Sequence, residues 1–224
     1  MCRKFPHMSA KKKITEQQII SSYMDEVLSD ESTAQSVYAF AKRHNFEEAD
    51  FYQFFNGFEH LQEEIFATFG RNTIEMIEQS SDYAQYETQQ KLLSFYFTFF
   101  ELLTANRSYM MAQLKGNKDK LSSLRVLGAL RRVFVQYVER LGVVRVDFKN
   151  DQLNRLRDKG VSESLWVQLL ITLKFWMDDR SKGFEKTDIF IEKSIKAQFD
   201  LIDTAPVHSV YDLAKFLWKE NAMV

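Results

Sequence analysis

Turn-forming residues are scarce in this chain. It has 7 Gly and 2 Pro among 224 residues, and both prolines, Pro6 and Pro206, lie close to its ends. Sandwiches, barrels and doubly wound sheets need Gly and Pro at their many turns. A hydrophobic content of 45% is nevertheless enough to bury a full core. We therefore predict an all-α protein.

The charge balance and the single cysteine bear on the compartment of the protein. A net charge of -1 gives no global field toward nucleic acid or an anionic membrane. Cys2 alone cannot form an intramolecular disulfide, which fits a reducing cytoplasm. Residues 1–13 lack the apolar stretch of a signal sequence, and the hydrophobic residues 92–103 are too few to span a bilayer. We expect a cytoplasmic protein with no membrane span and a basic, disordered arm over residues 1–13.

Helix signals recur along the chain. Thr15 and Gln18 form a capping box that predicts a helix up to about Ser29. Apolar spacing predicts two further short helices over 34–44 and 47–54, and a long one that follows. Later helices are expected over 92–103, 107–114, 121–141, 162–179, 187–204 and 209–221, with residues 150–157 as one or two separate charged turns before Gly160. The aromatic helix over 92–103 has almost no polar face, so we expect it at the centre of a domain.

The first short helices carry the spacing of a helix-turn-helix. The residues that form this pattern are Val37, Phe40, Ala41, Lys42, Arg43, Phe46, Phe51, Tyr52, Phe55, Glu59 and Leu61. Val37, Phe40, Ala41, Phe51 and Phe55 are expected on the inner faces, with the small Ala41 where the helices approach closest. Over residues 14–65 the pattern resembles the amino-terminal signature of the TetR family of transcriptional regulators.

The resemblance implies a fold and a division of the chain. A helix-turn-helix DNA-binding domain over residues 14–60 is expected to join, through a long helix, a larger helical ligand-binding and dimerisation domain over residues 61–224. In such proteins the first three helices bind DNA as a homodimer, and a small apolar ligand in the later domain shifts the spacing between the two reading heads.

The resemblance also implies DNA-contacting residues. Tyr52 matches a tyrosine that touches phosphate in the family, and Ser36 matches a hydroxyl residue at the start of the second helix. The remaining candidates lie on the outer face of the recognition helix or carry positive charge near it: Glu47, Glu48, Asp50, Gln53, Lys42, Arg43, Lys11, Lys12 and Lys13.

The recognition helix departs from the family pattern in its charge. Glu47, Glu48 and Asp50 replace the usual Ser-Lys-Gly-Thr stretch, and Phe58 stands where the family has a lysine. DNA affinity depends largely on Lys and Arg that neutralise phosphates. These carboxylates can cap a helix start or accept hydrogen bonds from cytosine. A second hypothesis is therefore a fold relative that has lost DNA binding and acts as a ligand-binding, lipid-binding or interaction protein; residues 165–218 resemble lipid-binding relatives that act in quinone biosynthesis.

Apolar residues of the later helices suggest a ligand pocket and a dimer interface. The predicted pocket residues are Phe95, Phe99, Met110, Met111, Phe134, Trp166, Leu170, Phe175 and Trp176. The predicted interface residues are Leu165, Leu169, Leu173, Ile191, Ile195, Leu213 and Leu217. For both sets the alternative is packing within one core.

Motifs for other chemistry are missing from the sequence. The 4 histidines lack metal-ligand spacing, and one cysteine cannot supply a zinc site. The chain has no GxxxxGK[ST], GxGxxG or GxSxG motif. Asp178 and Asp179 are most simply a charged helix end. We therefore predict no metal, no cofactor and no enzymatic activity.

Overall fold

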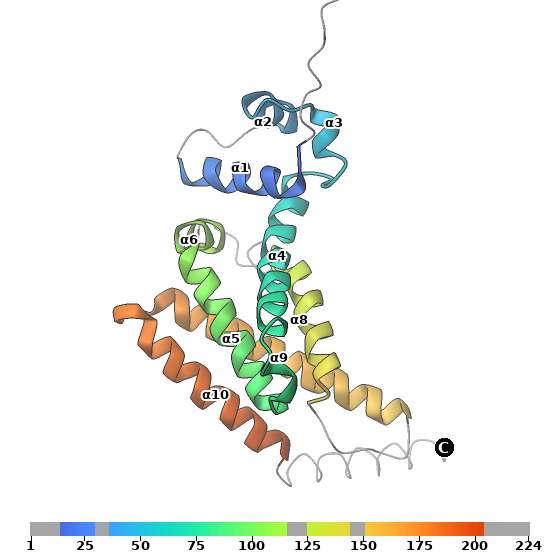
Figure 1. The fold of residues 1–224 in the computed structure, drawn as a ribbon, viewed down its shortest axis with the longest axis vertical. Coiled ribbons are helices and arrows are strands. Elements are labelled where there is room, and N and C mark those ends of the chain that lie inside the picture. The colour runs from blue at the N-terminus through green and yellow to red at the C-terminus, as the bar shows by residue number, and fades with distance from the viewer. Residues whose placement is uncertain (1–13, 30–35, 116–124, 144–150, 204–224) are drawn as a thin grey trace, which may run out of the picture. The chain divides into compact units, whose positions relative to one another are not determined.

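A computed structural model of the chain describes residues 14–29, 36–115, 125–143 and 151–203 (Figure 1). Every regular element within these ranges is a helix, so the all-α fold class is confirmed. The predicted arm over residues 1–13 and the predicted helix over 209–221 lie outside the described residues.

Contacts group the chain into two compact units. Unit 1 comprises Met1–Phe66 together with Asn106–Ala129, and unit 2 comprises Ala67–Ala105 together with Leu130–Val224. The predicted functional boundary divides the chain at one point, residue 60. The grouping by contacts differs, because it places a later helix, α6 (Arg107–Lys115), with the first three helices. That assignment follows from packing between α6 and α1 (Glu16–Leu28).

The capping signals at the start of unit 1 behave as the sequence predicts. Thr15 caps α1 by accepting a hydrogen bond from the Gln18 backbone N–H at 3.3 Å, and the Gln18 side chain accepts from the Thr15 N–H at 3.0 Å. The reciprocal pair satisfies two N–H groups that no helical carbonyl can reach. Ile19, Ile20 and Tyr23 then form the buried face of α1.

The second and third helices form the predicted helix-turn-helix. Ser36 caps α2 (Val37–Arg43), because its hydroxyl accepts from the Ala39 N–H at 3.2 Å. Phe40 is fully buried and contacts Phe51 of α3 (Glu48–Phe51) edge to face, with ring centroids 6.2 Å apart. Ala41 is also buried and accepts the Phe46 N–H at 3.0 Å, which closes the turn. The helix α3 is shorter than predicted, and α4 (Phe58–Glu78) follows it.

Unit 2 is built around the aromatic helix α5 (Thr88–Ala105). The buried face of α5 carries Leu92, Phe95, Tyr96, Phe99, Phe100 and Leu103. The Tyr96 hydroxyl donates to the carbonyl of Leu165 in α9 (Asp151–Asp178) at 3.3 Å. Helix α5 also packs against α10 (Glu185–Asp203), as Figure 1 shows. The expected central position of this helix is confirmed by its burial.

The predicted break before Gly160 is wrong. Helix α9 runs without interruption from Asp151 to Asp178, through Gly160. Glycine costs about 1 kcal/mol in a helix interior relative to alanine, which the rest of a 28-residue helix can offset. In contrast, Gly142 ends α8 (Gly128–Leu141) as predicted, with a φ of 60°.

A buried carboxylate forms the corner between α9 and α10. Asp179 accepts from the N–H and hydroxyl of Ser181 at 2.8 and 2.7 Å, and from those of Thr187 at 3.0 and 2.7 Å. Burial raises the pKa of Asp179, but the hydrogen bonds from Ser181 and Thr187 outweigh it and lower the pKa to about 2. The predicted charged helix end is thus a structural cap rather than a solvated one.

Candidate nucleic-acid interface and helical-domain surfaces

The outer face of α3 holds the acidic candidates for DNA contact. Asp50 accepts from the Glu47 N–H at 3.3 Å and from the Gln53 side chain at 3.1 Å. The Tyr52 hydroxyl donates to Glu48 Oε1 at 3.4 Å, while the Tyr52 side chain is 53% exposed. These carboxylates therefore have partners within α3 and the turn that follows it, in keeping with their role at a helix start.

The sequence-predicted cation Arg43 lies at the carboxyl end of α2. Its Nε and Nη2 donate to Glu26 of α1 at 2.7 and 3.0 Å, and His44 Nε2 lies 2.9 Å from the same carboxylate. Glu26 is buried, and although burial raises its pKa, the hydrogen bonds from Arg43 and His44 leave the pKa lowered. These two hydrogen bonds hold the Arg43 side chain in place and link α2 to α1.

Lys42, the other predicted cation of α2, is exposed. Its ammonium lies over the Tyr38 ring, 5.9 Å from the centroid. Tyr38 was not among the predicted site residues, although an aromatic residue four positions before a lysine on a helix predicts such a pair. The predicted contacts Lys11, Lys12 and Lys13 lie outside the described residues.

Phe58 explains one departure from the family pattern. Its ring stacks on Tyr23 with centroids 5.6 Å apart, and lies 5.7 Å from the rings of both Phe40 and Phe51. The side chain thus completes an aromatic cluster that joins α1, α2, α3 and α4. A lysine here could not make these contacts, so the loss of one phosphate contact accompanies a gain in core packing.

Most predicted pocket residues of unit 2 pack against one another. Phe95 stacks on Phe99 at 5.5 Å and contacts Phe134 at 5.2 Å, and Phe134 contacts Trp166 at 6.2 Å. All four are buried, as is Trp176, whose indole N–H donates to Thr104 at 3.0 Å. Leu170 is half-buried and Phe175 is 36% exposed. Met110 and Met111 belong to unit 1, where Met110 is buried and Met111 half-buried.

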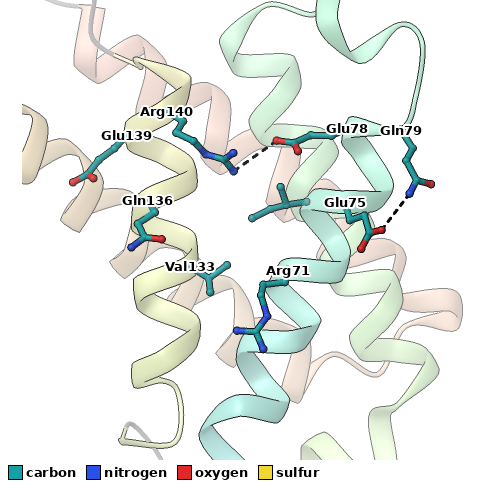
Figure 2. Close-up of a pocket in the computed structure, with 9 residues that line it drawn as sticks. Arg71, Glu75, Glu78, Gln79, Val133, Gln136, Glu139 and Arg140 are labelled. Carbon is teal, nitrogen blue, oxygen red and sulfur yellow. Dashed lines mark hydrogen bonds and ion pairs between the residues drawn. The ribbon is translucent and has the colours of Figure 1, made fainter. Parts of the chain in front are cut away.

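A groove in unit 2 lies between α4 and α8 (Figure 2). Its volume is about 1070 Å³, and Ile74 and Val133 contribute its apolar lining. Arg140 reaches across it to Glu78 at 3.6 Å. Close approach at Gly70 brings the two helices together, since a Cβ there would lie 2.8 Å from Leu130. None of the predicted pocket residues lines this groove.

A smaller groove of about 430 Å³ involves one predicted residue. Phe175 of α9 lines it with Ile189 and Phe190 of α10, and the Phe175 and Phe190 rings stack at 4.6 Å. The groove lies on the outer surface of these helices, where Ile189 is 50% exposed.

The described residues contain neither a metal-binding cluster nor a helix that could span a membrane. No group of three His, Cys, Asp or Glu side chains there is arranged to hold a metal ion. Likewise, no described helix combines the length and the apolar character that a membrane span requires.

Unit 1 contains a helix-turn-helix, and unit 2 is a helical domain built around α5. Residues 91–217 match the family described as "Tetracyclin repressor-like, C-terminal domain". This match covers more than half of the chain, and the chain belongs to the TetR family. It rests mostly on the later helices, whereas the sequence resemblance rests on residues 14–65.

A solved structure has the same fold. It is described as "fatty acid degradation regulator FadR from Bacillus halodurans" and is 15% identical in sequence, with a TM-score of 0.50. The similarity covers 87% of this chain and 97% of the other. No match was found among curated proteins. The TetR-like fold class is thus confirmed from both sequence and structure.

Proposed function

We propose that this protein is a cytoplasmic, homodimeric transcriptional regulator that binds DNA through α1, α2 and α3. The helix-turn-helix geometry carries the proposal: Ser36 caps α2, Ala41 is buried at the turn, and Tyr52 is exposed at the carboxyl end of α3. Membership of the TetR family, whose members regulate transcription, supports the same function. One such reading head contacts too little DNA to select a site alone, which favours a two-fold dimer.

The dimer proposal needs a different set of interface residues from the predicted one. Leu165, Leu169, Leu173, Ile191 and Ile195 are at most 5% exposed, so the prediction that they contact a partner is wrong. They pack within unit 2 instead, because α9 and α10 contact each other and α10 also packs on α5. Leu213 and Leu217 lie outside the described residues.

Other apolar residues of the same helices face outward. Val167 and Ile171 are both 51% exposed and, with Phe175, follow each other at four-residue spacing along α9. Ile189 of α10 is 50% exposed and lines the groove beside Phe175. A continuous apolar stripe of this kind is typical of an interaction surface. We propose that a second copy of the chain covers it.

Light scattering on charge-insertion variants tests the dimer. Val167→Glu with Ile171→Glu is expected to convert a dimer of the full chain to a monomer. Met76→Glu is the matched control, because Met76 is 53% exposed but lies on α4. A dimer that survives the double substitution, or one that the control also dissociates, would contradict this interface.

DNA binding is tested with the protein's own promoter region and random DNA, titrated across salt. Specific binding that weakens as salt rises supports the regulator, because the slope reports the number of phosphates neutralised. A variant that lacks residues 1–13 measures the share of the basic arm. Absence of binding even at low salt would contradict the proposal.

A second candidate function follows from the charge of α3. Glu47, Glu48 and Asp50 place three carboxylates at the start of the recognition helix. Such charge opposes a phosphate backbone, and a relative that has lost DNA binding would keep the scaffold for a ligand or a partner. The same salt titration separates the two functions.

The proposed effector is a small apolar ligand of unit 2. The fold neighbour named above, which is described as a regulator of fatty acid degradation, motivates the choice. Phe95, Phe134 and Trp166 pack against one another and would have to separate to admit a ligand between them. Fatty acids of increasing chain length are suitable probes. A ligand that binds only the folded protein raises the melting temperature with concentration. No increase with any chain length would contradict a fatty-acid effector.

A further inference from the structure

The described helices of the reading head contain few positive charges. Over residues 14–55 only Lys42 and Arg43 are basic, whereas eight positions are Asp or Glu. Arg43 is held by the buried Glu26 through two hydrogen bonds. Moving its guanidinium to a phosphate would leave that buried carboxylate without these two hydrogen bonds, which is unfavourable. Lys42 is therefore the cation of this segment that is best placed to meet DNA.

The position of Lys42 on α2 is favourable for this role. Val37, Phe40 and Ala41 form the buried face of the helix. Tyr38 and Lys42, four residues apart, share the outer face, where the Tyr38 side chain is 58% exposed. The ammonium lies above the ring and makes a cation–π contact with it. This contact restricts the rotamers of the lysine before any ligand arrives.

The tyrosine at the carboxyl end of α3 lies beside a carboxylate. The Tyr52 hydroxyl donates a hydrogen bond of 3.4 Å to Glu48 Oε1, four residues earlier. To donate to a phosphate it would have to leave this carboxylate, which also repels the phosphate. Tyr38 has a hydroxyl with no such carboxylate partner among the described residues.

We propose that Tyr38 and Lys42 form the principal phosphate contact of this reading head, so that α2 supplies the backbone contact that the acidic α3 lacks. Lys42 neutralises the phosphate, and Tyr38 is a positioning residue that holds the ammonium and adds a hydroxyl donor. The inference rests on the proposed DNA-binding function and identifies where that function meets the sugar-phosphate backbone.

Fluorescence anisotropy of the full chain on a labelled promoter duplex, repeated from 50 to 200 mM KCl, tests this contact. Lys42→Gln is expected to lower the affinity and to reduce the salt slope by about 0.9, the value for one phosphate. The affinity lost between the two salt concentrations then becomes about 3.5-fold smaller than in the unmodified protein. Lys174→Gln is the matched control, because it removes an exposed lysine from α9 and is expected to change neither quantity.

Tyr38 substitutions separate positioning from charge. Tyr38→Ala is expected to weaken binding at every salt concentration while the slope stays near that of the unmodified protein, because the lysine remains. Tyr38→Phe keeps the ring and reports the hydroxyl alone. Glu48→Gln is expected to strengthen binding, since it removes a carboxylate and loosens its hold on Tyr52. Unchanged circular dichroism spectra and melting temperatures show that each variant is folded.

The outcomes distinguish this inference from the proposed function. If the unmodified protein binds DNA and both Lys42→Gln and Tyr38→Ala bind with the same affinity and slope, the contact is wrong while the regulator stands. If the unmodified protein binds no DNA at any salt concentration, the proposed function fails and the contact fails with it. A smaller salt slope in Lys42→Gln, with an unchanged Lys174→Gln control, supports both.

Discussion

Two buried tyrosines of unit 1 are expected to respond oppositely to the same substitution. Among the described residues, the Tyr109 hydroxyl of α6 is a buried polar group with no hydrogen-bond partner. The Tyr23 hydroxyl of α1 accepts from Gln62 Nε2 at 2.5 Å and is also hydrogen-bonded to Gln113. Burial raises the pKa of both tyrosines, so both hydroxyls are neutral at any ordinary pH. Replacement of either by phenylalanine removes one oxygen and keeps the ring.

The expected magnitudes follow from the hydrogen bonds. An unsatisfied buried hydroxyl costs about 1–3 kcal/mol, so Tyr109→Phe is expected to raise the free energy of unfolding by about 1–2 kcal/mol. Tyr23→Phe loses two hydrogen bonds of about 1 kcal/mol each and is expected to lower it by a similar amount. With an m-value of about 2 kcal/mol/M, the urea midpoints of the two variants then differ by at least about 1 M.

Urea unfolding followed by circular dichroism at 222 nm and by tyrosine and tryptophan fluorescence measures the difference. Coincident curves from the two probes and equal m-values show that the midpoints can be compared. If Tyr109→Phe is destabilised as much as Tyr23→Phe, the Tyr109 hydroxyl makes a hydrogen bond in solution and the reasoning from its burial is refuted.

Three further substitutions probe the framework of the two units. Asp179→Asn is expected to lower the free energy of unfolding by about 2 kcal/mol at neutral pH. Because the pKa of Asp179 is lowered on folding, this stabilisation is present above about pH 4 and is lost as the pH falls toward 2. Acid unfolding curves are therefore expected to show a smaller loss of stability between pH 4 and 2 in the variant than in the unmodified protein. Glu26→Gln weakens the hydrogen bonds to Arg43, so a fall in melting temperature is expected, and an unchanged melting temperature would contradict a structural role for this pair. Phe58→Lys restores the residue of the family pattern but is expected to lower the free energy of unfolding by about 3 kcal/mol, because the aromatic cluster loses a ring. A variant with unchanged stability and higher DNA affinity would refute the claim that Phe58 is needed for core packing.

Local signals in the sequence were sufficient for the elements of unit 1. The Thr15 capping box, the Ser36 cap and the turn beyond Ala41 depend on residues a few positions apart, and the structure shows each of them. The scarcity of glycine and proline excluded sheets for the same reason, since turns are local. The continuity of α9 through Gly160 was missed because a single glycine weakens a helix without ending it.

The candidate site was less predictable. That Arg43 would bind Glu26 depends on side chains 17 positions apart, on helices whose packing no local pattern specifies. The exposed Tyr38 gave a detectable signal through its spacing to Lys42, but its importance follows only from the engagement of Arg43 and Tyr52 elsewhere.

The sequence by itself determined the fold class, the helix-turn-helix register and the resemblance to the TetR family. Helix periodicity and caps depend on residues only a few positions apart, so they can be recognised without the tertiary structure. Tertiary structure alone decided which apolar residues are core and which face outward. Leu169 and Ile171 lie two positions apart on α9, and one is 1% exposed while the other is 51% exposed. On a helix two positions differ by about half a turn, so the sequence predicted two faces but not which one α10 covers. That choice moved the proposed dimer contact from the buried leucines to the exposed stripe.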